Sequence, residues 1–405
     1  MAIRRRLTGE KVSPRRFYAF TDSVIDPGHD NPRLRLSLEF DAVDASRFDD
    51  PNLDESDDDF ALIRVITTHK RLGFFGLEAP KEGDWLLIEV GKERNTPRAW
   101  VAPAIGGFVP EGATNAPILR FLSGDADTAV VERIEKACSA PEAKRVKAVE
   151  VLNRLNLSKY KKLTITALDV GQAACVAFAD NCQDIGYFDI GKPISFNRRS
   201  FPKGFMRTYP LDGFVLLSHW DFDHFALAIN NPSLMGMDWY APDQKVGPYT
   251  ARFQRLLGPR LHFITGDASV SGVLLKRCIG VVPTDRNATG YVVRFERDGE
   301  VVLLTGDADY VWIPQEVKVK ATSLTMPHHG GKGTQPPKPA VCGTPIAVAS
   351  YGKPNTYKHP DDIQVMAHRK KGWRIRRTAA HGSSPRIPRS DQQLYPLDQE
   401  VKARL

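Results

Sequence analysis

The 405-residue sequence has no hydrophobic run that approaches the roughly 18–20 apolar residues a membrane helix needs. Its basic start, residues 1–6, is not followed by an apolar stretch, so we expect no secretory signal. The sequence has only 5 cysteines and no Cys-x-x-Cys pair, which disfavours a zinc finger. These absences predict a cytoplasmic protein with reduced thiols and no membrane contact.

Positive and negative residues are also nearly equal in number. The net charge of +8 is mild for this length and points only weakly to nucleic acid. With 42% hydrophobic and 26% charged residues, the composition is that of an ordinary globular protein of two or three domains. An acidic segment, 41–59, and a basic segment, 369–377, are each typical of a solvated face. The basic segment is also a candidate contact for a phosphate backbone.

The hydrophobic pattern divides the chain into four parts. The first is expected to be a small β-rich domain of unknown role, with strands at 60–66 and 84–90. The second shows helical periodicity on both sides of Pro141, and the third alternates short apolar strands with Gly/Asp turns. The expected parts are an N-terminal domain (1–127), a helical linker (128–160), a main domain (161–382) and a polar, peripheral tail (383–405). The expected strands of the main domain are 163–168, 185–190, 214–217, 291–295, 301–305 and 346–350.

Residues 219–224 read His-Trp-Asp-Phe-Asp-His, which puts four potential metal ligands into six positions directly after an apolar strand. Alternate residues of an extended segment point the same way, so His219, Asp221 and Asp223 can face one side together. His224 follows where the chain turns toward a helix. Closely packed acids repel one another unless a cation compensates. The segment therefore predicts a divalent-metal site with positions left open for water.

Three later segments add potential ligands near strand ends. Asp307 ends a buried strand, His328 and His329 stand beside glycines that allow close backbone approach, and His359 precedes a proline. Taken singly, Asp307 also fits a turn acid, His359 a loop residue, and one of the paired histidines a structural role. Five of the ten histidines fall in these segments and the hexad, which favours one shared site.

Together these motifs resemble the metallo-β-lactamase superfamily, whose signature HxHxDH is followed by a Gly-Asp and a later histidine. They are most similar to the hydrolase domain of ComEC-type competence proteins, which also replaces the second signature histidine by Asp. The resemblance is carried by Leu168-Asp169-Val170-Gly171-Gln172, His219-x-Asp221-x-Asp223-His224, Leu304-Thr305-Gly306-Asp307, Pro327-His328-His329-Gly330 and Asn355-x-Tyr357-x-His359-Pro360. It covers residues 160–382 and implies an α/β fold, an αββα metallo-β-lactamase-like sandwich with a metal site at the sheet edges. The membrane channel of the competence proteins is absent, so a role in DNA uptake does not carry over.

The resemblance also implies a role for each motif residue. One cation would lie between His219 and Asp221 and a second between Asp223 and His224, with Asp307 bridging. The expected metal ligands are His219, Asp221, Asp223, His224, Asp307, His328, His329 and His359, with Asp223 and His224 as catalytic residues. The expected partners that orient ligands are Asp189, Asn287 and Asn355. An Asp in place of a histidine makes the site harder, which favours Mn²⁺ or Mg²⁺ relative to a His-rich zinc site, and Zn²⁺ stays open.

Two positions depart from the superfamily pattern. The histidine that commonly lies between the signature and the Gly-Asp has only His262 as a counterpart, inside an apparent strand, and we interpret it as structural. Asn287 stands where the ComEC-like group carries an Asn, which leaves one metal pocket short of an imidazole.

The leading hypothesis is a metal-dependent phosphodiesterase, a nuclease that cleaves DNA through a metal-activated water. Trp220 and Trp373 are candidates for stacking on bases, although tryptophans are more commonly core residues. Two alternatives stay open: a hydrolase of a small molecule such as a lactone, thioester or β-lactam, and a non-catalytic regulatory module. A deep closed pocket would favour the small-molecule hydrolase, and an open basic groove would favour the nuclease. The N-terminal domain is a candidate for selecting the substrate or binding a protein partner.

Overall fold

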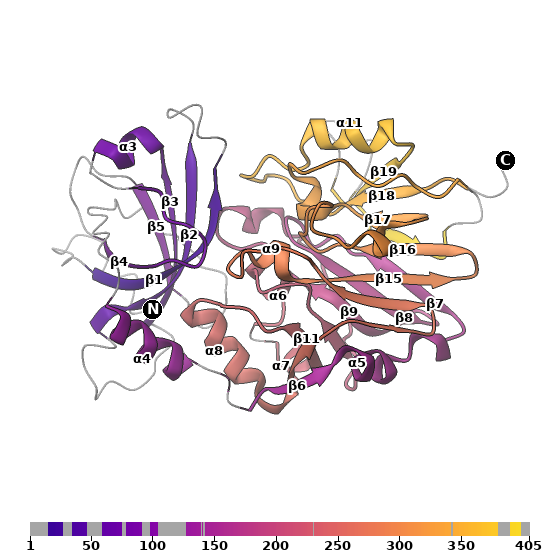
Figure 1. Ribbon diagram of the computed structural model, residues 1–405, viewed down its shortest axis with the longest axis horizontal. Coiled ribbons are helices and arrows are strands. Elements are labelled where there is room, and N and C mark those ends of the chain that lie inside the picture. The colour runs from indigo at the N-terminus through magenta and orange to yellow at the C-terminus, as the bar shows by residue number, and fades with distance from the viewer. Residues whose placement is uncertain are drawn as a thin grey trace. The chain divides into compact units, whose positions relative to one another are not determined.

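The computed structural model describes residues 15–26, 35–46, 59–74, 78–90, 98–103, 127–138, 140, 142–229, 231–341, 343–379 and 389–397. Contacts divide the chain into two compact units. The first unit combines Met1–Pro141 with Lys245–Leu256, and the second combines Glu142–Gln244 with Leu257–Leu405 (Figure 1). No helix among the described residues is both long enough and apolar enough to cross a membrane.

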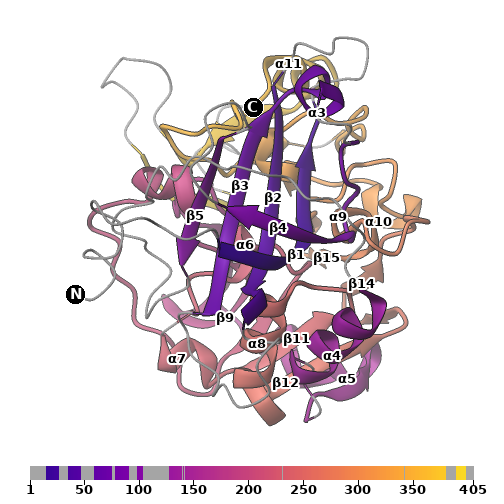
Figure 2. The same cartoon turned by 90° about the vertical axis from the view of Figure 1, so that its left-hand side faces the viewer.

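The first unit is built on a five-stranded antiparallel sheet of order β4-β1-β2-β3-β5, in which β2 and β3 can be followed side by side in Figure 2. Its strands are β1 (Arg15–Ile25), β2 (Leu36–Asp44), β3 (Phe60–Thr67), β4 (Trp85–Val90) and β5 (Arg98–Pro103). Its helices are α3 (His69–Phe74), α4 (Thr128–Cys138) and α8 (Pro248–Leu257). Phe17, Phe40 and Ile63 are buried in its core. The expectation of a β-rich N-terminal domain is confirmed.

Helix α8 comes from the second half of the sequence, but its N-terminus is capped by Asp41, a residue of the first half. The fully buried Asp41 of β2 accepts hydrogen bonds from the Tyr249 and Thr250 backbone N–H groups and from the Thr250 hydroxyl, each at 2.9 Å. A carboxylate here satisfies N–H groups that have no partner within the helix and complements the positive end of its dipole. The acidic segment 41–59 is therefore not solvated throughout, because its first residue, Asp41, is a buried helix cap.

The second unit consists of two sheets. The eight-stranded sheet has the order β20-β7-β8-β9-β10-β11-β12-β6, and the seven-stranded sheet the order β13-β14-β15-β16-β17-β18-β19. The strands of the first are β6 (Lys144–Lys147), β7 (Leu163–Ala167), β8 (Cys175–Asp180), β9 (Gln183–Ile190), β10 (Phe214–Leu216), β11 (Asp238–Pro242), β12 (Leu261–Thr265) and β20 (Gln392–Tyr395). The strands of the second are β13 (Ala268–Val270), β14 (Val273–Arg277), β15 (Tyr291–Arg297), β16 (Glu300–Leu304), β17 (Ser323–Thr325), β18 (Ile346–Ala349) and β19 (Arg374–Arg377).

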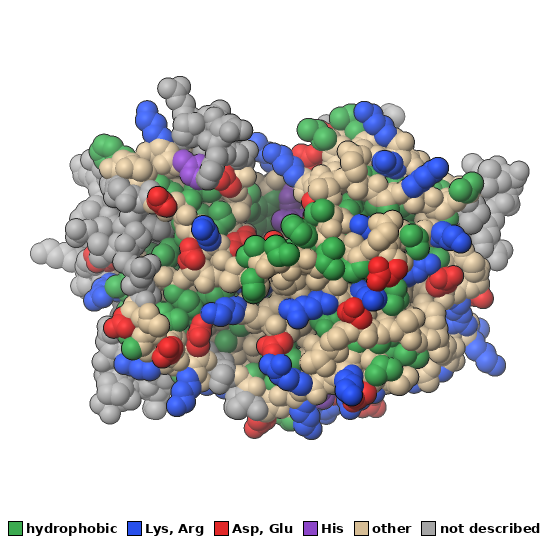
Figure 3. Space-filling model, in the orientation of Figure 1, with side chains coloured by type: hydrophobic (Ala, Val, Ile, Leu, Met, Phe, Trp, Pro, Cys, Tyr) green, Lys and Arg blue, Asp and Glu red, His purple; other side chains and the backbone are tan. Residues whose placement is uncertain are grey.

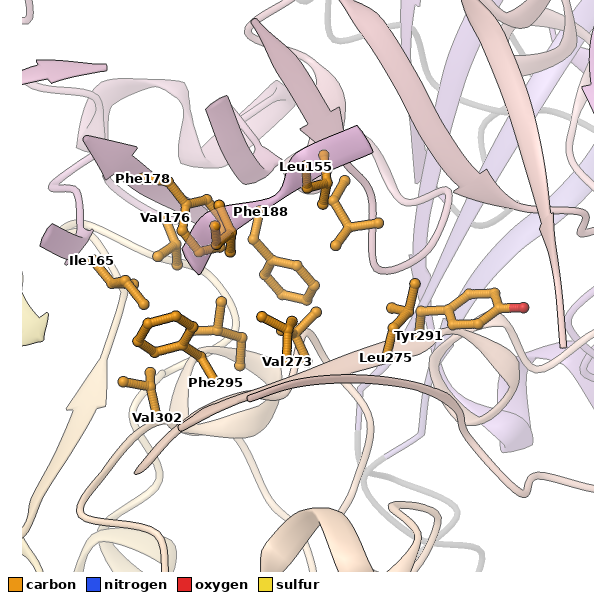
Figure 4. Close-up of a cluster of buried hydrophobic side chains, with 14 of the residues drawn as sticks. Leu155, Ile165, Val176, Phe178, Phe188, Val273, Leu275, Tyr291, Phe295 and Val302 are labelled. Carbon is orange, nitrogen blue, oxygen red and sulfur yellow. The ribbon is translucent and has the colours of Figure 1, made fainter. Parts of the chain in front are cut away.

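The side-chain alternation of β16 shows how the layers form. Val302 and Leu304 belong to a core shared by both sheets, whereas Val301 and Leu303 belong to a second core with residues of helices α10 and α11. Alternate strand residues point to opposite faces, so a strand that is buried on both faces is apolar throughout. Figure 4 shows the shared core, with aromatic and aliphatic side chains of the two sheets converging. The helices are α5 (Ala148–Leu155), α6 (Phe222–Phe225), α7 (Pro232–Met235), α9 (Arg286–Thr289), α10 (Gln315–Lys318) and α11 (Asp362–Lys370).

This layering confirms the expected α/β sandwich and each strand expected in the main domain. The helical linker differs from expectation. Helix α4 belongs to the first unit, whereas β6 and α5 belong to the second, and β6 pairs in parallel with β12. Residues 144–147 lie inside the segment 128–160 that we expected to be helical, but they form β6, on which Val146 is buried. A strand this short shows too little alternation to be separated from the helix that follows it.

The expectation of a peripheral tail is wrong. Strand β20 pairs antiparallel with β7, and its Leu394 and Tyr395 are buried in the core shared by the sheets. Just before it, Arg389 donates two hydrogen bonds, of 2.6 and 2.7 Å, to the carboxylate of Asp169. The tail is polar on average, so its composition did not predict that Leu394 and Tyr395 are buried on an edge strand of the sheet. Residues 383–388 and 398–405 of the expected tail lie outside the described residues.

We therefore expect Leu394→Ala to lower the free energy of unfolding by about 2–5 kcal/mol, because it opens a cavity in a closed core. Urea denaturation would measure this loss. The matched control is Gln393→Ala on the same strand, whose half-exposed side chain should contribute about 0.5 kcal/mol or less. An unchanged urea midpoint for Leu394→Ala would contradict the assignment of β20 to the core.

Candidate metal centre

The predicted ligands lie at the carboxyl ends of strands from both sheets of the second unit. The hexad follows β10 and runs into α6, while Asp307 follows β16. His329 lies in a turn, Pro327–Gly330, that follows β17, and His359 comes after β18. Neighbouring parallel strands end at the same edge of a sheet, which brings these loops together.

Five of the eight predicted ligands converge. His219, His224 and Asp307 form one group and Asp223, His224 and His329 a second, and the ligand atoms within each group lie within 4.8 Å of one another. His224 Nε2 is 3.2 Å from an Asp307 oxygen, and His329 Nε2 is 3.1 Å from an Asp223 oxygen. His224 is common to both groups, so the five residues form one centre.

Hydrogen bonds fix the orientation of the three imidazoles. His224 Nδ1 donates to Asp189 at 2.9 Å, and His329 Nδ1 donates to the Ser350 carbonyl at 2.9 Å. The Ser218 hydroxyl donates to Asp189 at 2.9 Å and so accepts from His219 Nδ1, also at 2.9 Å. When these rings are neutral, the hydrogen bonds place the proton on Nδ1 and leave the Nε2 lone pair facing the centre.

This tautomer places lone pairs against lone pairs. His219 Nε2 lies 3.2 Å from an Asp221 oxygen, and the Nε2 atoms of His224 and His329 are as close to Asp307 and Asp223. The Nε2 atoms of His219 and His224 are buried and have no hydrogen-bond partner in the described part of the chain. Buried acceptors that face one another are unfavourable unless positive charge lies among them. The donor set therefore fits a divalent cation.

The pKa values of the same groups show the surplus of negative charge. Burial alone would lower the pKa of His224, but Asp307 and Asp189 raise it well above its ordinary value. Burial likewise opposes protonation of His329, yet Asp307 and Asp223 raise its pKa. For Asp307 burial acts upward, and the nearby histidines hold its pKa well below its usual range. The centre is thus built to contain positive charge.

The structure gives Asp221 a partner that the sequence did not reveal. One oxygen of Asp221 accepts from Arg286 Nε at 2.8 Å and Nη2 at 2.7 Å, and the Arg286 side chain is almost fully buried. Burial would raise the pKa of Asp221, but Arg286 and then His219 hold it below its ordinary value. Asp221 lies outside both ligand groups. Because Arg286 balances its charge, Asp221 makes the site less hard than we expected from the sequence.

His328 and His359 also lie outside the two groups. The His359 ring stacks on His329 with centroids 6.1 Å apart, and its Nδ1 is 3.1 Å from Gln172 Nε2. Burial, followed by the charges of His328 and His329, lowers its pKa well below the ordinary value, so His359 is neutral. The His328 ring packs edge-on against His359, with centroids 5.2 Å apart. These two histidines form a layer beside the ligands.

The three residues expected to orient ligands lie in different environments. Asp189 bonds His224 and Ser218, as described above. Asn355 accepts from the His359 N–H and donates to the His359 carbonyl, both at 2.9 Å, so it fixes the loop that carries this histidine. Asn287 follows Arg286 on α9, and its buried Oδ1 has no hydrogen-bond partner among the described residues.

Backbone strain marks the same site. Asp189, His328 and His329 have φ values of 57°, 49° and 56°, in the left-handed region that residues other than glycine rarely adopt. Such conformations cost about 1–3 kcal/mol each and persist where surrounding contacts hold them. Gly306, with a φ of 53°, lets β16 end against Ser218, since a Cβ there would lie 2.6 Å from the serine hydroxyl.

Three residues considered in the sequence take no part in the centre. His262 is on β12 and stacks on Tyr240 with centroids 5.2 Å apart, which agrees with a structural role. Trp220 and Trp373 are buried, and each indole N–H donates to a backbone carbonyl. Neither tryptophan is available for stacking on a base.

Comparisons with known proteins found no matching family model and no matching curated protein. The search of solved structures found metallo-β-lactamase fold protein YhfI from Bacillus subtilis, with 17% identity over 40% of this chain and 70% of that one and a TM-score of 0.27. It also found zinc-bound PqqB from Methylobacterium extorquens, at 13% identity over 51% and 85% and a TM-score of 0.29. A possible metal-dependent hydrolase from Veillonella parvula matches at 15% identity over 53% and 84%, with a TM-score of 0.30. At these low TM-scores the matches carry no argument about activity, which depends on the site geometry.

We expect Asp189→Asn to weaken Zn²⁺ binding roughly 10-fold to 100-fold, because the amide no longer accepts both the His224 and the Ser218 protons. Asn tolerates the left-handed backbone at this position, so the fold should persist. Competition with a chromophoric chelator would measure the affinity. Asp184→Asn on the same strand is the control, since Asp184 pairs with Arg207 and Tyr187 instead. Equal affinities for the two variants would contradict the orienting role.

A second variant tests the balance of charge around Asp221. Arg286→Met should lower the free energy of unfolding of the metal-free protein by about 1–3 kcal/mol, because the half-buried Asp221 carboxylate loses its charged hydrogen-bond partner. Added Mn²⁺ should restore more stability to this variant than to the wild type, since a cation can replace the guanidinium charge. Thermal unfolding with EDTA or Mn²⁺ would show both effects. Arg260→Met, at an exposed ion pair, is the control, and an equal loss of stability in the two variants would contradict the role of the Arg286–Asp221 pair.

Proposed function

We propose that this protein is a metal-dependent hydrolase and, more specifically, a phosphodiesterase that cleaves DNA or another nucleic acid. The observation that carries the proposal is the convergence of three imidazole Nε2 atoms and two carboxylates at strand ends. The residues that would hold one or two divalent cations are His219, Asp223, His224, Asp307 and His329. A cation bound by them would lower the pKa of a bound water toward neutrality and stabilise charge on the attacked group.

The protein side chains divide the remaining work. Asp223 is the most exposed of the five, with 24% of its side chain accessible, so it is the carboxylate best placed to accept a proton from an attacking water. His224 and Asp307 are almost fully buried and keep their geometry through Asp189 and Gly306. Preorganised groups of this kind need no rearrangement when charge develops.

The donor set bears on the choice of metal. Three imidazoles and two carboxylates form a mixed nitrogen and oxygen set, and Arg286 balances the additional carboxylate, Asp221. Imidazole suits Zn²⁺ and other first-row metals, whereas Mg²⁺ prefers oxygen ligands and water. We therefore favour Zn²⁺ or Mn²⁺ over Mg²⁺.

The substrate class has three supports. The resemblance to the ComEC-type hydrolase domain covers residues 160–382, and that group is associated with nuclease activity. The net charge is +8, and lysine and arginine side chains are spread among acids over the face shown in Figure 3. Finally, the pocket beside His359 is lined by Lys353, Lys358 and Arg377. A phosphodiester fits these positive charges better than a neutral lactone or thioester does.

The test is hydrolysis of labelled single- and double-stranded DNA in the presence of Mn²⁺, Zn²⁺ or Mg²⁺. We expect cleavage with Mn²⁺ or Zn²⁺, and a rate for Asp223→Asn that is lower by roughly 100-fold or more, because the proton acceptor is lost. Asp180→Asn, at a turn on the same unit, is the matched carboxylate-to-amide control.

Two results would reject the nuclease. Intact DNA with every metal, together with hydrolysis of a lactone or thioester, would assign the centre to a small-molecule hydrolase. Absence of both bound metal and activity would assign it to a non-catalytic module. Metal analysis of the purified protein separates these two cases.

A further inference from the structure

A pocket of about 810 Å³ lies within the second unit, at the carboxyl ends of β18 and β19. The residues lining it are Tyr351, Lys353, Pro354, Asn355, Lys358, His359, Pro360, Asp362 and Arg377. None of the five residues of the metal centre is among them. The pocket therefore offers a second set of polar groups whose role is not explained by metal binding.

The charge of the pocket is positive. Three cationic side chains, Lys353, Lys358 and Arg377, face one carboxylate, that of Asp362. Both lysines are exposed, and Arg377 is half-buried. A guanidinium that is partly withdrawn from water interacts more strongly with an anion than a fully solvated lysine does.

Two buried polar atoms in this wall have no partner in the described structure. The Tyr351 hydroxyl belongs to a fully buried side chain, and Arg377 Nε is buried as well; neither makes a hydrogen bond to a described residue. Burial raises the pKa of Tyr351 and Arg377 opposes the rise, so the hydroxyl keeps its proton and can donate it. A buried donor without an acceptor is unfavourable, and both donors belong to residues that line the same pocket.

The two donors are held in place by their backbone. Ala349 of β18 is opposite Arg377 of β19, and Thr378 links the ends of both strands. The Thr378 hydroxyl accepts from the Tyr351 N–H at 3.1 Å and donates to the Tyr351 carbonyl at 3.2 Å. Donors fixed in this way lose little entropy when they bind a ligand.

His359 connects the pocket to the metal centre. It lines the pocket, and its ring stacks on that of His329, which in turn lies with its centroid 5.6 Å from that of His224. A molecule with one reacting group at the metal centre can therefore place a neighbouring group in the pocket. In a nucleic acid the neighbouring charged group is the next phosphate of the backbone.

We propose that this pocket is an anion subsite that binds a phosphate of the substrate next to the one at the metal centre. The inference rests on the proposed function and names the contacts by which a nucleic acid would be held. The non-bridging oxygens of a phosphodiester accept from the Arg377 guanidinium, and the Tyr351 side chain supplies a further donor in the same wall. Lys353 and Lys358 add charge at the exposed rim. Charge-assisted bonds to phosphate are among the stronger hydrogen bonds in proteins.

The first test uses calorimetry to measure the affinity of EDTA-treated protein for pyrophosphate. Arg377→Gln should weaken this binding roughly 10-fold to 100-fold, because a charge-assisted bond is lost. Tyr351→Phe should weaken it less, by roughly 5-fold to 10-fold, and should not destabilise the fold since the hydroxyl has no partner to lose. Arg374→Gln, an exposed arginine of the same strand that does not line the pocket, is the matched control and should bind as the wild type does.

Equal binding by wild type, Tyr351→Phe and Arg377→Gln would overturn the subsite. The second readout is kinetic: on single-stranded DNA, Arg377→Gln and Tyr351→Phe should raise KM more than they lower kcat. Wild type that binds pyrophosphate through Arg377 but leaves DNA intact would support an anion pocket and reject the nuclease. Wild type that cleaves DNA with a KM unaffected by either substitution would support the nuclease and reject the subsite.

Discussion

The arrangement of the metal centre depends on one buried carboxylate. Asp189, at the end of β9, accepts the Ser218 N–H at 2.7 Å, the Ser218 hydroxyl at 2.9 Å and His224 Nδ1 at 2.9 Å. Through Ser218 it also fixes the proton of His219 on Nδ1. A single side chain thus sets the tautomer of two candidate ligands and ties the loop after β10 to the neighbouring strand. Its left-handed backbone is strained, and the three hydrogen bonds hold it there.

Much of this site could be predicted from the sequence because its ligands are local. The hexad brings His219, Asp223 and His224 together over six positions, and Asp307 and His329 follow apolar strands that any layered fold must bury. The partner of Asp221 could not be predicted, since Arg286 is 65 residues away and contacts it only through the fold. The sequence drew attention to Asn287, which directly follows Arg286. Nothing in a sequence, however, distinguishes a buried arginine from a solvated one.

The fold shows the same division between local and distant information. The apolar runs of the main domain predicted its strands, because alternation and length are properties of a single segment. Strands β6 and β20 were missed since each is only four residues long and becomes recognisable through its neighbour, β12 or β7. The capping role of Asp41 was missed for the same reason. An acid among other acids is expected to be solvated, and its burial follows only from a helix whose Tyr249 lies 208 residues later.

The cap formed by Asp41 on α8 has a consequence for how the chain is made. The first unit takes its last helix, residues 245–256, from beyond the start of the second. A ribosome that has released only the first 141 residues has therefore not yet supplied the N–H groups that Asp41 needs, and its carboxylate must stay hydrated. The N-terminal sheet cannot reach its final state before β6 to β11, six of the eight strands of the hexad-bearing sheet, have been synthesised, because α8 follows them in the chain. Folding of the two units is consequently interleaved in time, and a cut at any one position cannot separate them into complete pieces.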